Sequence, residues 1–150
     1  MLGSEVTWVQ DNIDTWKGFL KNMKIEYEEF TDLDLEEGKH FEYNLIILAG
    51  SKSMSDIEVM RLKKYIDQGG SVLATGGVST FSDEAKWRGW DFFKETFGMQ
   101  FTKELSPEEA LQKTHTLRGN LPLTAGIPTG YVLQIATWDR PVYAEVLEPR

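Results

Sequence analysis

The sequence contains no cysteine and only two histidines among its 150 residues. Without cysteine there can be no disulfide bond, no thiolate metal site and no cysteine nucleophile. No apolar run approaches the roughly 20 residues that a membrane-spanning helix needs, and no basic, apolar leader opens the chain. These absences exclude several classes of enzyme, and we expect a cytoplasmic protein that does not enter a membrane.

Positive charge is also scarce, since the formal net charge is −8 and the pI is near 4.8. Such a chain repels phosphate backbones, so nucleic acid is not an expected partner. The hydrophobic share of 41% is ordinary for a globular protein. Because a chain of this length fits one domain with a real core, we expect a single domain over residues 1–150.

The middle of the chain predicts a strand, a helix and a second strand. Residues 44–50, NLIILAG, form a continuous apolar run that is typical of a parallel strand covered on both faces. The SDIE sequence at 55–58 predicts a capping box that opens a helix ending at Gln68, and SVLAT at 71–75 predicts the next strand. Together they indicate a parallel βαβ unit. Four apolar residues of this helix should face the core: Val59, Leu62, Tyr65 and Ile66.

The flanking regions complete an α/β pattern. The first strand is expected either as a short one at EVTWV or as one lost upstream, if the domain is excised from a longer chain. We also expect a helix at 12–23, an edge strand at 24–30, a solvated acidic connection at 32–38 and a helix in DFFKETF that ends at Gly98. Further on, QFTKEL predicts a strand, SPEE at 106–109 a helix, and THTLRG, YVLQIATW and PVYAEVLEP three strands. The predicted fold is a three-layer, flavodoxin-like sandwich with a mostly parallel sheet and a β-rich C-terminal edge.

Residues 44 to about 101 resemble the class I glutamine amidotransferase-like superfamily, through NLIILAGSKSMSDIEVMRLKKYIDQGGSVLATGG and DFFKETFGMQF. The sequence of these stretches is most similar to non-catalytic branches such as the trimerisation domain of bacterial β-galactosidases. The trehalose-utilisation family is similar in the order of its strands and helices. The resemblance implies a flavodoxin-like fold and a role in assembly or small-ligand sensing near carbohydrate-processing proteins. Its expected partners are a homo-oligomer or other domains of a parent protein.

The glycine turn after the second strand decides whether catalysis is expected. In catalytic relatives this strand ends in a nucleophilic cysteine on a strained elbow, and the resemblance aligns Gly76 with that cysteine. Thr75 and Ser79 are nearby hydroxyls, but each needs a base within hydrogen-bond reach, and only His40 and His115 exist. We therefore predict no catalytic residue. The alternative is a sugar-modifying enzyme similar to the trehalose-utilisation family.

That enzymatic alternative would use His115 as the catalytic histidine. Its acid would be Asp83 or Glu84, which follow the glycine turn in the sequence. The other interpretation of His115 is a surface or strand histidine.

Any ligand should bind beyond the carboxyl ends of the parallel strands. The residues predicted there are Gly50, Ser51, Lys52, Thr75, Gly76, Gly77 and Ser79. Their backbone amides suit a small anion or a sugar hydroxyl. The G-S-K-S sequence lacks the full phosphate-loop spacing, and no histidine and carboxylate pattern matches a metal site. We predict no cofactor and no metal.

The aromatic stretch AKWRGWDFF follows the glycine turn. We expect Trp90, Phe93 and Phe97 in the core. Trp87 and Arg88 should lie outside, where they are candidates for a protein interface or for stacking on a sugar ring.

Overall fold

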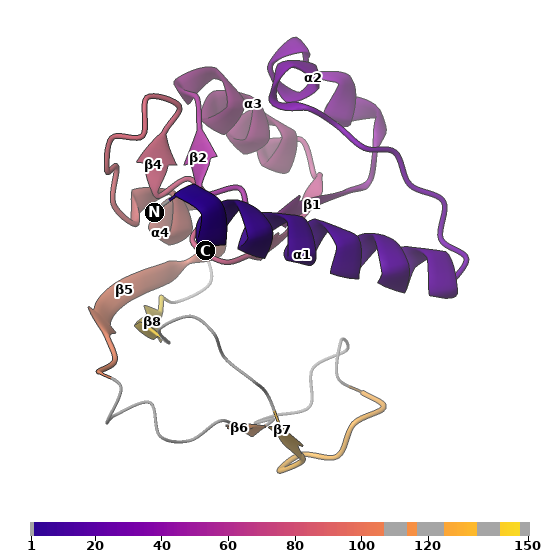
Figure 1. Ribbon diagram of the computed structural model, residues 1–150, viewed down its shortest axis with the longest axis vertical. Coiled ribbons are helices and arrows are strands. Elements are labelled where there is room, and N and C mark those ends of the chain that lie inside the picture. The colour runs from indigo at the N-terminus through magenta and orange to yellow at the C-terminus, as the bar shows by residue number, and fades with distance from the viewer. Residues whose placement is uncertain (1, 107–113, 117–124, 135–141, 148–150) are drawn as a thin grey trace. The chain divides into compact units, whose positions relative to one another are not determined.

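The computed structural model describes residues 2–106, 114–116, 125–134 and 142–147. The chain divides into two compact units, residues 1–100 with 147–150 and residues 101–146. The first unit contains α1 (Leu2–Asn22), α2 (Asp32–Glu37), η1 (Lys39–Glu42), β1 (Leu45–Ala49), β2 (Ser53–Met54), α3 (Asp56–Asp67), β3 (Ser71–Thr75), β4 (Phe81–Ser82) and α4 (Asp91–Phe97) (Figure 1). No helix in the described ranges is both long and apolar enough to cross a membrane.

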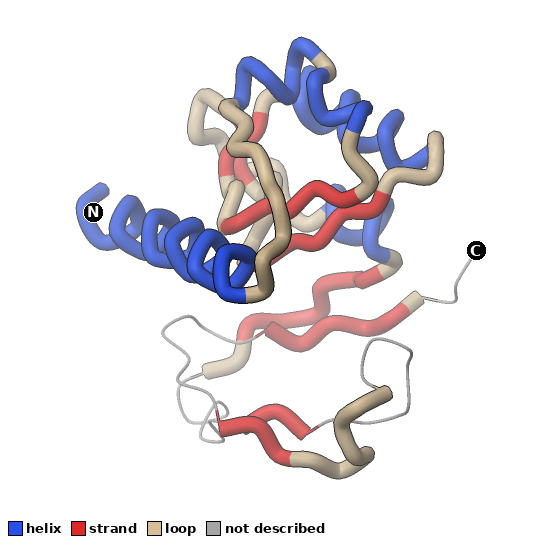
Figure 2. Tube along the Cα trace, turned by 90° about the vertical axis from the view of Figure 1, so that its right-hand side faces the viewer, coloured by secondary structure: helices blue, strands red, loops and turns tan. Residues whose placement is uncertain are grey.

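The predicted βαβ unit is confirmed. Strands β1 and β3 lie side by side and pair in parallel, with Leu45 opposite Ser71 and Ala49 opposite Thr75 (Figure 2). Helix α3 joins them and begins at the predicted capping box, in which the amide of Glu58 donates to Ser55 Oγ over 3.1 Å. After the helix, Gly69 takes the left-handed φ of 94° that ends it before β3.

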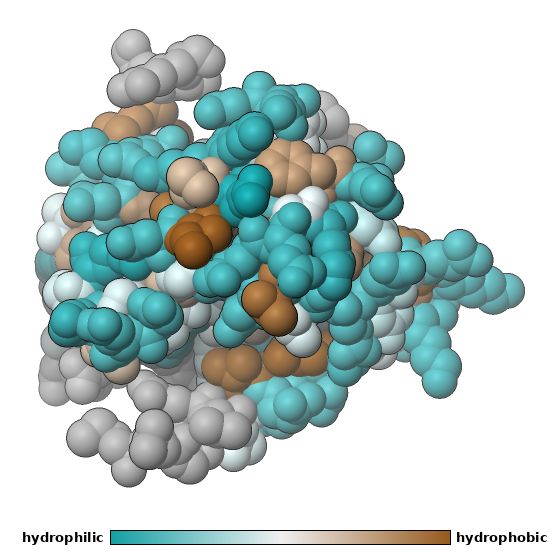
Figure 3. Space-filling model, turned by 90° about the horizontal axis from the view of Figure 1, so that it is seen from above, coloured by the Kyte–Doolittle hydropathy of each residue, from teal (hydrophilic) through white to brown (hydrophobic). Residues whose placement is uncertain are grey.

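The core of the first unit lies between α3 and the two parallel strands. Leu62 is fully buried, Tyr65 is 2% exposed, and Val59 and Ile66 pack against them, so the predicted core face of α3 is confirmed. The remaining buried apolar residues are Leu35, Ile46, Leu48, Met54, Val78 and Phe92. The face seen over α2 and α3 is mainly hydrophilic, with apolar side chains in small separate patches (Figure 3), which is ordinary for a protein surface.

The N-terminal prediction needs correction, because EVTWV is helical and not a strand. Helix α1 begins at Leu2 and therefore includes the whole segment. The apolar spacing of the predicted helix continues upstream through Val9, which stands four residues before Ile13 and is partly buried with it. This helical repeat outweighs the β propensity of a short run of valine, threonine and tryptophan.

Two further segments differ from their predictions. Residues 25–31 have no regular secondary structure, and no backbone hydrogen bond joins them to a described strand. Because a β-strand is defined by backbone pairing with a neighbour, these residues do not form the predicted edge strand. Residues 32–37 form α2 and not a solvated connection, because Thr31 and Asp34 make a capping box and Leu35 is buried.

The second unit contains strands in the predicted order. They are β5 (Met99–Glu104), which starts in the first unit, β6 (Thr114–Thr116), β7 (Val132–Gln134) and β8 (Val142–Val146). Strand β5 pairs with β8, and β6 pairs with β7 in the antiparallel direction. The helix predicted from SPEE at 106–109 lies outside the described residues, apart from Ser106. The described strands make small parallel and antiparallel sheets, so the protein is a mixed α/β chain.

His40 is a buried residue that the core holds in its neutral form. Its ring is fully buried, lies 5.4 Å from the Tyr65 ring and 4.5 Å from the Phe41 ring, and neither ring nitrogen has a hydrogen-bond partner among the described residues. Burial lowers the pKa of His40 below its ordinary value of 6.5, and the charge of Arg61 acts in the same direction.

Replacing His40 should remove part of the acid sensitivity of folding. Because the pKa is lower in the folded state, the unfolded chain binds more protons, and folding stability should fall as the pH drops through about 6.5. A His40→Leu variant should lack this loss. Denaturant unfolding of both proteins between pH 5 and 8 measures the difference, in which the contribution of His115 cancels. Parallel stability curves would contradict the prediction.

Candidate functional site

The two turns predicted to form a site lie against each other at the carboxyl ends of β1 and β3. The amide of Gly50 donates to the Thr75 carbonyl over 3.1 Å, and the amide of Ser79 donates to the Ser51 carbonyl over 2.9 Å. Further along, β2 and β4 continue the contact as a short parallel pair. The structure therefore brings the seven predicted residues together, as expected for turns at one edge of a parallel sheet.

The indole of Trp8 covers this turn pair. A Cβ atom added to Gly50 would lie 2.8 Å from Trp8 Cζ3, and one added to Gly76 would lie 2.6 Å from Trp8 Cη2. Both glycines also have left-handed φ values, 77° and 76°. The Lys52 ammonium lies 4.7 Å from the centre of the Trp8 ring, within cation–π range. Helix α1 thus packs the Trp8 indole directly against the backbone of Gly50 and Gly76.

The two hydroxyl residues of the turn are engaged in structural contacts. Ser79 is fully buried, has a left-handed φ of 56°, and its Oγ accepts a hydrogen bond from Arg88 Nη1 over 3.0 Å. Thr75 Oγ1 donates to the Leu48 carbonyl at 3.5 Å, the limit of a hydrogen bond. A buried serine bonded to a cation has neither a base nor room to attack a substrate.

The histidine of the first unit, His40, lies at the other end of the sheet. His40 packs on Tyr65, whose hydroxyl donates to the Tyr43 carbonyl over 2.9 Å and lies 3.4 Å from the Ser71 carbonyl at the start of β3. Thr75 ends the same strand, about 13 Å further on at 3.3 Å per residue. His40 therefore does not reach the hydroxyls of the glycine turn.

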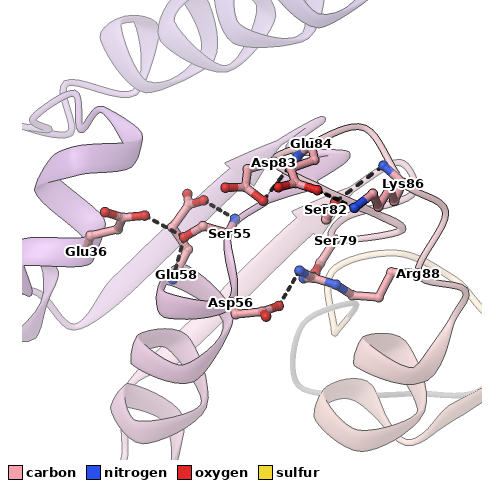
Figure 4. Close-up of polar contacts among 10 residues, drawn as sticks. All are labelled: Glu36, Ser55, Asp56, Glu58, Ser79, Ser82, Asp83, Glu84, Lys86 and Arg88. Carbon is pink, nitrogen blue, oxygen red and sulfur yellow. Dashed lines mark hydrogen bonds and ion pairs between the residues drawn. The ribbon is translucent and has the colours of Figure 1, made fainter.

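Arg88 joins the glycine turn to the start of α3. Its Nη2 contacts Asp56 Oδ1 at 2.5 Å, and its Nη1 donates to Ser79 Oγ (Figure 4). The Arg88 amide also donates to the Thr80 carbonyl over 2.7 Å. These contacts leave the Arg88 side chain 23% exposed, so Arg88 is partly buried at the surface. Sequence spacing gave no sign of them, since Asp56 and Arg88 stand 32 residues apart.

The aromatic side chains next to Arg88 lie close to their predicted positions. Trp87 is 59% exposed and contacts the Phe81 ring edge-on at 5.0 Å. Phe93 and Phe97 are partly buried and pack against the core, while Trp90 is partly buried and contacts Phe93. The aromatic residue of this stretch with the deepest burial is Phe92, which the sequence analysis did not place in the core.

The acids proposed for the enzymatic alternative lie in the exposed turn after β4. Asp83 accepts a hydrogen bond from the Glu84 amide over 3.1 Å, and Glu84 pairs with Lys86 at 2.5 Å (Figure 4). His115 belongs to β6 of the second unit, and its side chain lies outside the described part of the structure. Among the described side chains, neither acid makes a hydrogen bond to a histidine.

A second polar cluster links α2 to α3 and was missed by sequence reasoning. Ser55 Oγ donates to Glu36 Oε1 over 2.5 Å, and Arg61 Nε donates to the Glu36 carbonyl over 3.0 Å. Glu58 is 4% exposed, and its burial raises the pKa of its carboxyl group. The hydrogen bond from the Ser55 amide opposes this shift in part, while the nearby Asp32 and Glu36 charges add to it. Because every one of these groups has a partner, the cluster holds two helices together.

No group of three or more histidine, aspartate or glutamate side chains in the described ranges is arranged to hold a metal ion. Comparison with known proteins gave no match to any family model, curated protein or solved structure.

Adding a methyl group at Gly76 should destabilise the fold, because the new Cβ would clash with Trp8. The left-handed φ alone costs about 1 kcal/mol for a residue with a Cβ, and the close contact with the indole adds about 1–3 kcal/mol. Gly76→Ala should therefore lower the free energy of unfolding by about 2–4 kcal/mol. Denaturant unfolding measures this difference.

Gly89 provides the matched control, because its φ is 89° and no atom lies within 4 Å of an added Cβ. Gly89→Ala should cost only the backbone part, about 1 kcal/mol. In a Trp8→Ala background the cost of Gly76→Ala should fall to the same value. Equal costs at the two glycines in the wild-type background would show that Trp8 does not pack on Gly76.

Proposed function

We propose that this chain is a non-catalytic amidotransferase-like domain that serves in assembly or senses a small ligand, in association with a carbohydrate-processing protein. The single observation that carries the proposal is at Gly76. The resemblance aligns this glycine with a nucleophile, and it has the left-handed backbone of a sharp elbow while Trp8 fills the space where a side chain would project.

The surroundings of Gly76 support the same proposal. Ser79 is buried against Arg88, and His40 belongs to the opposite end of the sheet. A nucleophilic mechanism needs a nucleophile, a base and an exposed reacting atom in one place. The described residues of the first unit do not provide this combination.

The proposed fold is the three-layer, flavodoxin-like sandwich. Its support is the parallel β1–α3–β3 unit, together with α1 packed against β1 and α3 packed against β3. Within such a sandwich, Trp8 of α1 would cover the edge of the sheet at which ligands bind in related folds.

If the domain senses a ligand, that ligand would be a small anion or a sugar. Its support is the position of two cations beside the glycine turn, Lys52 over Trp8 and Arg88 on Ser79. Backbone amides and cationic side chains suit anionic oxygen atoms. Trp87, which is 59% exposed next to Arg88, offers an apolar ring for a sugar face or for a partner protein.

The proposal predicts that the purified chain hydrolyses neither glutamine nor a simple ester. Release of ammonia from glutamine and of nitrophenol from p-nitrophenyl acetate should equal that of buffer, and Thr75→Ala and Ser79→Ala should change nothing. A rate above buffer that falls in either variant would overturn the non-catalytic assignment.

Light scattering across a dilution series then separates the two roles. A dimer or trimer that survives dilution supports assembly. A monomer supports sensing, in which case titration with sulfate or a monosaccharide should shift the amide resonances of Gly76 and Gly77, and Arg88→Gln should weaken that response. Failure of both measurements would contradict the proposal.

A further inference from the structure

Strand β1 has a pairing neighbour on one edge only among the described residues. The Asn44 carbonyl accepts from the Ser71 amide, and the Gly50 amide donates to the Thr75 carbonyl, each over 3.1 Å. In a parallel pair, alternate residues direct their peptide groups to the same neighbour. The even-numbered residues of β1 therefore bond β3, and the peptide groups of Leu45, Ile47 and Ala49 point to the other edge.

A cavity of about 570 Å³ lies along that unpaired edge. It is lined by β1 on one side, by the extended residues 25–31 on another, and by α1 through Ile13, Trp16 and Leu20. No backbone hydrogen bond crosses from residues 26–30 to β1 in the described structure. The space beside β1 is therefore mainly apolar, and it is bordered by a row of backbone donors and acceptors with no partner among the described residues.

The sequence of β1 is that of an interior strand and not of an edge strand. Its residues LIILA are apolar toward both faces, as in strands covered on both sides and flanked by neighbours. Natural edge strands usually carry a lysine, a proline or a bulge that prevents further pairing. Strand β1 has none of these features, and Leu45 is 51% exposed.

We propose that the free edge of β1 accepts an extended, mainly apolar strand with basic flanks, supplied by a partner polypeptide. Main-chain hydrogen bonds to Leu45, Ile47 and Ala49 would hold it, as in other cases of β-strand addition. The charge of the partner follows from the cavity lining, in which Glu26, Glu28 and Glu29 outnumber one cation, Lys17, which pairs with Glu29 over 2.8 Å. This inference does not depend on the function proposed above.

The test uses the full chain and a synthetic peptide, KKVLIVLKK, with an apolar centre and lysine flanks. We expect binding in the micromolar range by isothermal titration calorimetry. With saturating peptide, hydrogen exchange of the Ile47 and Ala49 amides should slow at least tenfold. The amides of Ile46 and Leu48, which already bond β3, should change less. A peptide N-methylated at two adjacent central residues, which blocks both of its edges, should bind at least tenfold more weakly.

Two variants of Ile47, one a test and one a control, probe the same edge from the side of the protein. Ile47→Pro removes a peptide N–H that faces the free edge and leaves the ladder to β3 intact, so it should abolish binding, whereas Ile47→Val should not. If Ile47→Pro does not fold by circular dichroism, the exchange measurement on the wild-type chain decides.

Three results would overturn the proposal. The first is absence of peptide binding to the wild-type chain. The second is binding without protection of Ile47 and Ala49, which would show that the cavity takes an apolar ligand by its side chains alone. The third is protection of these amides that rises with protein concentration when no peptide is present, because the occupant would then be a second copy of this chain.

Discussion

The contact of Trp8 with Gly50 and Gly76 is the constraint on which the first unit depends. One indole fits over two turns only because both lack a Cβ, and the same two glycines adopt left-handed backbone that other residues disfavour. The contact fixes where α1 crosses the end of β1 and β3. It thereby also positions the rest of α1, including Trp16, beside the free edge of β1.

This constraint explains why the polar groups around the glycine turn serve structure. Once the indole occupies the space above Gly76, no side chain can project there, and the hydroxyl of Ser79 turns inward to Arg88. Arg88 in turn reaches Asp56 at the start of α3. Together these contacts join the glycine turn to the start of α3 by packing and charge pairing.

Sequence patterns predicted the parts of the fold that local chemistry decides. The capping box at Ser55, the left-handed end at Gly69 and the apolar strands on either side of α3 depend on neighbours in the sequence, and they are where they were expected. The turns of the candidate site also came together, because parallel strands end at the same edge.

What the sequence did not predict depends on contacts between distant residues. Trp8 was assigned to a strand because a five-residue window does not show the helical repeat that continues through α1. The partnership of Arg88 with Asp56 spans 32 residues. Residues 25–31 have strand-like alternation but no regular structure, since a strand also needs a neighbour to pair with.

The most direct test of this account is the nuclear magnetic resonance spectrum of the two glycines. An indole packed on their α-carbons should move the α-proton resonances of Gly50 and Gly76 strongly upfield and give cross-relaxation to the Trp8 ring, and both effects should vanish in Trp8→Leu. Ordinary glycine shifts without contacts to the indole would contradict the central claim that Trp8 closes this turn.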